Sequence, residues 1–440
     1  MPLFFCRTLT TDMRVLALLC VALLAYVMCS TSASDSDSTD VDSLTVESLE
    51  SVRSDLYFSG SKFTILQFTD THYSLVCINS HVNAVMKAMA NQHQPDLIVH
   101  TGDVVLHHRN QSTQSSYIKK FISDMDSLEV PWTLALGDHE FDAELTRDEI
   151  FALLNRSAYY VGPVDAGDIL GAPIHHGLPV YAYKGASKPA LVVWGFDTSH
   201  NCTSSYVQEE GCIDTNAASF AFNEASSNGW NYVPGVAFTH IPQREWHSAA
   251  GSSDVVIGDR YETSPAPPSS EVLDFPSSVP IRLWSTGHLH RNSAVMPADS
   301  YDGTILLAHG VKTGLCSYTM GAERGSGGRV IVAELGGSTA TTLRTYESRC
   351  HLSGRCYDQN KVTLAMSNDK ANYRGSVIEP WRSGTLTSYV MVLGTLCVGV
   401  IVAVFFITFC VFRAGYRRHK ASKTKLVVPM LSQRDEVVTV

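Results

Sequence analysis

The sequence has no excess of basic residues. Its 33 Lys and Arg residues are outnumbered by 43 Asp and Glu residues, which gives a formal net charge of -10 at pH 7. Because non-specific nucleic-acid binding needs a basic face, this balance excludes nucleic acid as the main partner. Internal repeats are also absent, while hydrophobic residues make up 45% of the chain. That content allows a sizeable core in one large domain or two ordinary ones, and it excludes a wholly disordered chain.

Aromatic residues are missing between residues 30 and 55, where Ser, Thr and Asp dominate. Such a composition cannot bury a core, so we predict a disordered linker over 34–56. An apolar run at 15–28 precedes it, after two arginines and before small residues. The length of this run suits a signal peptide better than a membrane span. Residues 1–33 are therefore predicted to be a signal peptide, with an uncleaved N-terminal anchor as the alternative.

Charged residues are missing from a second apolar run at 389–412. Its length matches the roughly 30 Å hydrocarbon layer of a bilayer, which predicts one transmembrane helix. Six basic residues follow within 413–425, so the positive-inside bias places the tail 413–440 in the cytoplasm. The sequence therefore predicts a membrane protein of the secretory pathway whose folded part is luminal or extracellular.

The cysteines and glycosylation sequons fit that compartment. Six cysteines lie between the two apolar runs, namely Cys77, Cys202, Cys212, Cys316, Cys350 and Cys356. An even number in an oxidising compartment suggests disulfides. Short spacing favours the pairs Cys202–Cys212 and Cys350–Cys356, which leaves Cys77 for Cys316; other pairings and free thiols stay open. N-x-[S/T] tripeptides at Asn110, Asn155 and Asn201 predict N-glycosylation in the same region.

From residue 63 onward, apolar runs of strand character alternate with stretches of helical periodicity. The runs "FTILQF" (63–68), "DLIVHT" (96–101) and "WTLAL" (132–136) enclose helical stretches at 82–90 and 117–125. This β-α-β-α-β order predicts parallel strands with crossover helices. Further strands are expected at 191–196, 235–238, 281–285, 304–307 and 329–335. A cysteine-containing stalk is predicted over 349–388.

Polar side chains directly follow five of these predicted strands. They are Asp70 and His72, then Asp103, then Asp138, His139 and Glu140, then His240, and finally His288 and His290. In an open α/β sheet, ligands bind beyond the carboxyl ends of the strands, so these side chains should converge. Several carboxylates and imidazoles in one crevice are costly unless cations neutralise them. This mixture suits Zn, Fe or Mn, and the ligands are numerous enough for two metal ions.

The ordered series "DTH", "GD", "GDHE", "TH" and "GHLH" resembles the calcineurin-like metallophosphoesterase superfamily over roughly residues 63–346. The longer stretches "FTILQFTDTHY", "PDLIVHTGDVV", "FTHIP" and "GHLHRN" resemble its purple acid phosphatase-like eukaryotic branch. The resemblance implies a four-layer α/β fold over 57–348, in which a β-sandwich is flanked by helices. It also implies a dinuclear metal centre at one edge of the sandwich.

The resemblance further implies a role for each polar position. Asp70, His72 and His290 would bind one metal, Asp138, His240 and His288 the other, and Asp103 would bridge the two. His139 would be the catalytic residue, which donates to the leaving oxygen or to charge on the phosphoryl group. Glu140 would not bind a metal itself but would hold one of the metal ligands in position. The implied activity is hydrolysis of phosphomonoesters by a hydroxide that bridges the metals, without a covalent intermediate.

Two positions depart from the family pattern. Purple acid phosphatases have an iron-binding tyrosine three residues after the bridging aspartate, whereas this chain has Leu106 there. No tyrosinate-iron colour is therefore expected, and the choice among Fe, Zn and Mn is open. Asp138 stands where the family has asparagine. A carboxylate offers the metal a charged oxygen but offers the phosphate no amide donor, so we expect tighter metal binding and weaker phosphate binding in an active enzyme.

Two other functions stay open at this stage. The same metal chemistry would serve a phosphodiesterase of the acid sphingomyelinase or nucleotide pyrophosphatase type. Alternatively, the chain could be a non-catalytic surface protein in which the metals only stabilise the fold. Asp138 favours that second alternative, as does the C-terminal sequence "VVTV", which could fit a PDZ groove.

Overall fold

The computed structural model describes most of residues 55–376. The segments left out of this range are 75–78, 107–110, 142–144, 164–173, 200, 204–207, 211–212, 214–215, 247–248, 250–255, 263–274, 301–302, 316–325, 352–354 and 367–373. The predicted signal peptide, nearly all of the predicted linker, the span at 389–412 and the tail lie outside the described residues. Within the described ranges, no helix is both long enough and apolar enough to cross a membrane.

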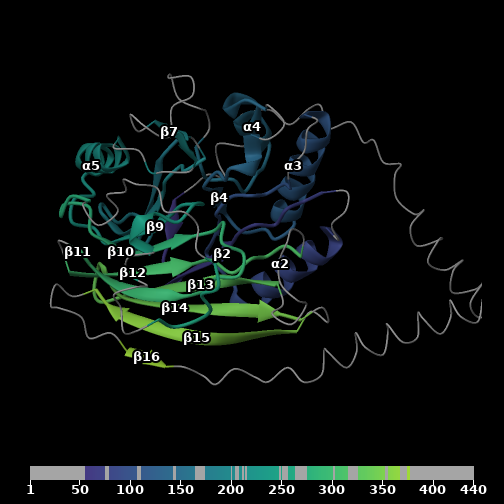
Figure 1. Ribbon diagram of the computed structural model, residues 1–440. Helices are drawn as coiled ribbons and strands as arrows, with labels where there is room; N and C mark the ends of the chain where they lie inside the picture. The colour runs from purple at the N-terminus through teal and green to yellow at the C-terminus, as the bar shows by residue number, and fades with distance from the viewer. Residues whose placement is uncertain are drawn as a thin grey trace, which may run out of the picture. The chain divides into compact units, whose positions relative to one another are not determined.

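Two seven-stranded sheets form the centre of the fold (Figure 1). The first sheet has the order β1 (Leu56–Tyr57), β5 (His176–Tyr181), β6 (Pro189–Gly195), β9 (Gly235–Phe238), β10 (Ile281–Thr286), β12 (Gly303–His309) and β11 (Val295–Ser300). The second sheet has the order β16 (Arg374–Ser376), β15 (Cys356–Ala365), β14 (Ala340–Cys350), β13 (Ser326–Leu335), β2 (Lys62–Phe68), β3 (Leu97–His100) and β4 (Trp132–Leu134). A separate small ribbon pairs β7 (Asn201–Thr203) with β8 (Gln208–Glu210).

The helices cover the outer faces of the two sheets. They are α2 (Asn79–His93), α3 (Gln111–Asp126), α4 (Arg147–Leu154) and α5 (Asn216–Asn228), with a 3-10 turn η2 at His139–Phe141. Figure 1 shows α2 and α3 on the side opposite α5. Helix α4 begins with a capping box, in which Thr146 accepts from the Glu149 amide and the Glu149 carboxylate accepts from the Thr146 amide. This exchange satisfies two amides at the helix start.

Strand alternation explains the layers. In β2, Phe63 and Ile65 face the core between the two sheets, while Leu66 and Phe68 pack on the opposite side with the α2 and α3 helices. In the first sheet, Leu191 faces the inner core and Trp194 packs outward with α5. Because successive residues point to opposite faces and both faces are covered, these strands carry apolar residues on both faces. The result is the expected helix, sheet, sheet, helix arrangement.

The predicted β-α-β-α-β unit is confirmed, because β2, β3 and β4 pair in parallel and are separated by α2 and α3. The stalk predicted from residue 349 begins too early. Residues 356–365 form β15, which pairs with β14 in an antiparallel register. Val362 and Leu364 are buried in the inner core. The sequence pattern did not indicate this strand, because the residues before Val362 are hydrophilic and only the C-terminal end of the strand is buried.

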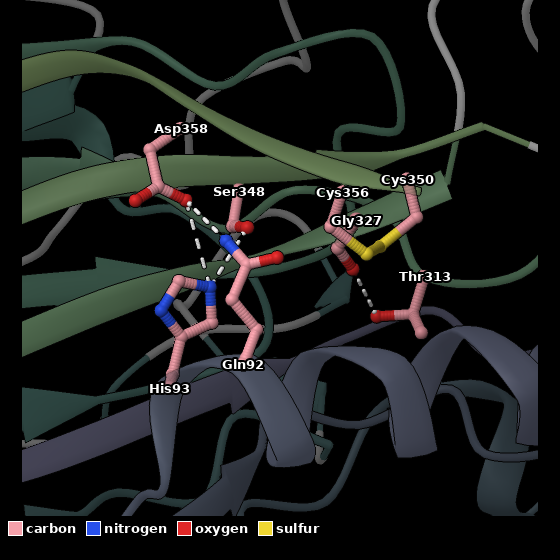
Figure 2. Close-up of a disulfide and its surroundings, with 8 residues drawn as sticks. All are labelled: Gln92, His93, Thr313, Gly327, Ser348, Cys350, Cys356 and Asp358. Atoms are coloured by element: carbon pink, nitrogen blue, oxygen red, sulfur yellow. Dashed lines mark hydrogen bonds and ion pairs between the residues drawn. A yellow bond between two sulfur atoms is a disulfide. The ribbon is translucent and has the colours of Figure 1, made fainter. Parts of the chain in front are cut away.

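A disulfide closes the hairpin between β14 and β15. Cys350 and Cys356 lie opposite each other in the register and are bonded, as predicted from their spacing. Figure 2 shows this bond near the C-terminal end of α2, where Gln92 donates to Asp358 at 3.2 Å and His93 Nε2 lies 2.9 Å from Ser348 Oγ. The disulfide therefore links β14 and β15 in a part of the hairpin that also contacts helix α2.

Replacing both cysteines, Cys350→Ser with Cys356→Ser, is expected to destabilise the protein by about 2 kcal/mol. The reason is that a short closed loop no longer restricts the unfolded chain. A urea titration of both proteins measures the difference in the free energy of unfolding. Equal midpoints for the two proteins would show that hairpin pairing alone is sufficient.

Candidate metal centre

Five strands from two different sheets bring the predicted polar residues together. Strands β2, β3 and β4 of the second sheet precede Asp70 and His72, Asp103, and Asp138 with His139, respectively. Strands β9 and β10 of the first sheet precede His240 and the pair His288 and His290. Hydrogen bonds from two backbone amides join these loops: the His288 amide donates to the Asp70 side chain at Oδ2, at 3.1 Å, and the Gly287 amide donates to the His240 carbonyl at 2.8 Å.

The loops that carry these residues are unusually tight. Asp70, His72, Asp103 and His288 all have positive φ angles, between 50° and 65°. Such a backbone costs a non-glycine residue on the order of 1–3 kcal/mol and is typical of functional sites. Gly102 and Gly137 allow two of these loops to touch, because a Cβ on Gly102 would lie 2.5 Å from the Gly137 amide nitrogen. The glycines of the "GD" and "GDHE" motifs are therefore required by this close approach.

The side chains form two groups that share one aspartate. The first group is Asp70, His72, Asp103 and His290, and the second is Asp103, Asp138, His240 and His288. Within each group, one ligand atom from every residue lies within 4.8 Å of the others. This division is the same as the one implied by the family resemblance. The first group is buried, whereas the Asp138 and His288 side chains of the second group are 27% and 29% exposed.

The donor atoms of both groups fit metal ions. His72 Nε2 lies 3.0 Å from His290 Nε2, and His240 Nε2 lies 3.0 Å from Asp138 Oδ1. Asp70 Oδ1, Asp138 Oδ1 and His240 Nε2 are buried, and although His290 Nε2 lies 3.1 Å from Asp70 Oδ1, none of the three makes a hydrogen bond of suitable geometry among the described residues. Buried polar atoms of this kind are nearly always paired, and carboxylate and imidazole atoms that face one common point suit a cation.

The electrostatics of the centre also favour positive charge. Burial opposes ionisation of Asp70, but His290, His240 and Lys312 outweigh it and hold the Asp70 pKa well below its usual range. Burial likewise opposes the charged form of His240, yet Asp103 and Asp138 raise its pKa well above the ordinary value. Burial and the Lys312 charge lower the pKa of His72 to about 3, so His72 is neutral and its lone pair is available to a metal.

His139 lies on the accessible side of the two groups. Its side chain is 32% exposed, and its Nε2 atom lies 3.8 Å from Asp103 Oδ2 and 4.0 Å from Asp138 Oδ2. Glu140 behaves differently, since it is buried and its carboxylate accepts from three backbone amides, those of Asp103, Val104 and Gly137. Burial and the nearby Asp103 charge raise the pKa of Glu140 to about 7, against the effect of these amides. Glu140 thus ties the turn of His139 to the loop of Asp103.

Sequence reasoning missed three buried residues beside the centre. Lys312 donates from Nζ to the Asp70 carbonyl at 3.3 Å, and burial lowers its pKa to about 8. His100 Nε2 lies 3.2 Å from Oγ1 of Thr71, the residue between the predicted ligands Asp70 and His72 in the sequence. Gln114 of α3 donates to the carbonyls of His139 and Glu140. None of them belongs to the five short motifs, although His100 lies in the stretch "PDLIVHTGDVV" and Gln114 could have been noticed as a polar residue on the apolar face of a helix.

The remaining predicted sites are only partly described. Asn155 caps the C-terminus of α4 and is half-buried, and Asn201 lies in β7, while Asn110 lies outside the described residues. Cys202 lies in β7, and Cys77, Cys212 and Cys316 lie outside the described residues. Glycosylation and the other two disulfides therefore stay predictions.

A buried ion pair between Asp197 and Arg147 predicts a pH dependence of stability. Asp197 follows β6, is 1% exposed, and pairs with Arg147 of α4. Burial opposes its ionisation, but Arg147 and Ser199 lower the Asp197 pKa below its ordinary value. A lowered folded-state pKa stabilises the fold above the unfolded pKa of about 3.9, and the effect is lost as the pH falls toward the folded-state pKa.

Asp197→Asn should accordingly lower stability near neutral pH and make the acid-side decline shallower. Urea titrations between about pH 3 and pH 7 measure this as the slope of the unfolding free energy against pH. An identical slope in both proteins would show that Asp197 does not contribute to acid unfolding.

Comparison with known families agrees with this geometry. The sequence profile of the calcineurin-like phosphoesterase family matches residues 63–292, which is more than half of the chain. The chain therefore belongs to the calcineurin-like phosphoesterase family. Membership and the two residue groups together imply two metal ions.

Curated relatives include purple acid phosphatase-like proteins. Phosphatase DCR2 of Saccharomyces cerevisiae is 21% identical over 65% of this chain and 51% of its own length. Probable inactive purple acid phosphatase 29 of Arabidopsis thaliana is 24% identical over 49% of this chain and 63% of its own length. The chain thus spans about half to three fifths of these relatives.

Solved structures with a similar fold include two phosphatases. A dimetal phosphatase from Danio rerio aligns with 69% of this chain and 99% of its own, at 12% identity and a TM-score of 0.42. The purple acid phosphatase PPD1 from yellow lupin aligns with 70% of this chain and 54% of its own, at 11% identity and a TM-score of 0.40.

Proposed function

We propose that this chain is a membrane-anchored, dinuclear metal-dependent phosphoesterase, an acid phosphatase-like hydrolase of phosphomonoesters. The observation that carries the proposal is the pair of ligand groups that share Asp103 and contain buried atoms without hydrogen-bond partners among the described residues. When bound, two cations would polarise the phosphoryl oxygens and bring the pKa of a coordinated water to about 7. The anchor in this proposal is the apolar run at 389–412.

The chain's own residues would divide the work of the reaction. The seven residues of the two groups would hold the cations, and Asp103 would be shared by both. His139 belongs to neither ligand group, is partly exposed and lies within 4.0 Å of Asp103 and Asp138, so it would meet an incoming phosphate and donate a proton to the leaving oxygen. Glu140 would fix the loop of Asp103 through its amide bonds.

The metals in this proposal are drawn from Fe, Zn and Mn. The position of the colour-giving tyrosine is Leu106, and the neighbouring Tyr73 donates its hydroxyl to Asp124 at 2.9 Å. A tyrosine held in this way does not supply a phenolate to the centre. Metal analysis of the purified protein by mass spectrometry should therefore find two ions per chain, and its visible absorption spectrum should have no purple band.

Phosphomonoesters are favoured over diesters by the relatives. The yeast relative is named a phosphatase, and the plant relatives are named probable inactive purple acid phosphatases. The purified full-length chain in detergent should release phosphate from a mono-aryl phosphate faster than it cleaves a bis-aryl phosphate. A chelator should abolish the release. Faster diester cleavage would support the phosphodiesterase alternative.

A non-catalytic role is the second candidate. Two of the relatives are named probable inactive enzymes, and Asp138 replaces the family's asparagine. In that case the chain would bind two metals but turn over neither mono- nor diesters. Bound metal without any hydrolysis across a broad pH range would replace our proposal with this one.

Asp138→Asn is expected to keep turnover within a few-fold and to tighten phosphate binding. The asparagine would restore an amide donor toward the phosphate, at the cost of a charged metal ligand. Inhibition by inorganic phosphate measures the binding, and the hydrolysis rate measures turnover. A large loss of turnover would show that the carboxylate itself is required here.

A further inference from the structure

A buried glutamine holds the turn that carries His139. Gln114 lies on the buried face of α3, together with Ile118, Phe121 and Met125, and is 0% exposed. Its Nε2 donates to the His139 carbonyl at 3.1 Å and to the Glu140 carbonyl at 2.8 Å. An amide in this apolar position is costly unless its polar atoms are paired, so the two carbonyls account for its presence.

The orientation of the amide follows from these two partners. Both carbonyl groups are acceptors, so only the NH2 end of Gln114 can face them. Gln114 Oε1 has no hydrogen-bond partner among the described residues. The side chain therefore acts here through its NH2 group alone. A glutamate would place a negative charge against the same carbonyls, and a methionine would fill the space without donating.

The His139 peptide is therefore held from two sides. Its amide donates to Asp103 Oδ1 at 3.2 Å, and its carbonyl accepts from Gln114. The imidazole itself is 32% exposed, and its Nε2 lies 3.8 Å from the nearer Asp103 oxygen. The ring also stands edge-on to His72, with 5.8 Å between ring centroids, so the position of the backbone decides whether the imidazole can keep this place beside Asp103. Small misplacements of a reacting group cost large factors in rate.

We propose that Gln114 is a positioning residue of this site: it fixes the 3-10 turn that aims His139 at the space beside Asp103 and Asp138. The inference rests on the proposed phosphoesterase activity and adds a residue to it. A purely structural role would affect folding without depending on His139, and this difference can be measured.

The test compares Gln114→Met with Gln111→Met, the same substitution at an exposed position of the same helix. Gln114→Met should lower kcat on an aryl phosphate by about ten- to hundredfold and change KM by less than about threefold. Bound metal should be unchanged, and Gln111→Met should behave as the unmodified protein. In a His139→Ala background, Gln114→Met should add little further loss, because it acts through that side chain. An equal loss in both backgrounds, or no loss at all, would overturn the proposal.

A second measurement does not depend on catalysis. In protein with 15N-labelled histidine, Gln114→Met should shift or broaden the His139 imidazole resonance and leave that of His351 unchanged. An unchanged His139 resonance would overturn the proposal even if no ester is hydrolysed, so its failure is distinct from failure of the proposed function. If Gln114→Met does not fold, Gln114→Asn, which keeps the donor but withdraws it by one methylene, should give a smaller change in the same direction; no change in the resonance would also count against the proposal.

Discussion

Asp103→Asn is expected to remove activity and to lower the metal content of both sites. Asp103 is the one residue common to the two ligand groups, with Oδ2 at 3.7 Å from His72 Nε2 and Oδ1 at 3.3 Å from His240 Nε2. An asparagine loses one oxygen and the negative charge that both cations would share. Metal chemistry contributes several kcal/mol to such reactions, so the rate should fall by at least about a thousandfold.

The matched control is Asp138→Asn, the same change in a residue of only one group. Metal analysis by mass spectrometry and aryl phosphate hydrolysis should be measured on both variants. Asp103→Asn should lose metal from both sites, whereas Asp138→Asn should weaken binding only at the site of His240 and His288 and should keep both ions in excess metal. If Asp103→Asn kept two ions per chain and most of its activity, the shared-ligand arrangement would be wrong.

His139→Ala is expected to lower kcat by about a hundredfold to ten-thousandfold while two metal ions stay bound. A positioned general acid contributes a factor of this size. His139 belongs to neither ligand group, and its side chain lies on the accessible side of the centre. The loss should therefore appear in turnover, and the metal content should not change.

Two comparisons make this result specific. His351→Ala replaces a histidine that stacks on Tyr357 at the end of β14, and it should leave kcat unchanged. A substrate with a good leaving group needs less help from an acid, so His139→Ala should affect it less than a poor one. An equal loss for both substrates would assign His139 to binding the phosphoryl group instead of protonating the leaving oxygen.

Much of the fold could be predicted because its strands are buried on both faces. Runs such as "FTILQF" and "GVAF" carry apolar residues on both faces, and the structure places them at β2 and β9. Strand β15 was missed because most of its residues are only half-buried, and its apolar residues are confined to one end. Helix α4 was missed because it has only eight residues, too few for a clear helical period, although Ile150, Phe151, Leu153 and Leu154 are buried. Helix α5 was missed because its buried residues are alanines.

Motif order alone predicted the members of the candidate centre. Each motif comes directly after a strand. The structure brings all seven proposed ligands into two groups, with His139 and Glu140 beside them. The single-sheet argument for this convergence was incomplete. Three of the strands belong to one sheet and two to the other, so the centre depends on how the sheets pack.

The sequence by itself determined the chemistry of this protein: the residue types, their order along the chain and the strand ends that carry them. Only the tertiary structure decided which strands share a sheet, which loops take the strained backbone of Asp70 and Asp103, and which buried residues hold the site from behind. The physical reason is that strand periodicity is local, whereas the bonds of Gln114 and Lys312 join residues far apart in the chain, or in separate elements, at distances set by packing.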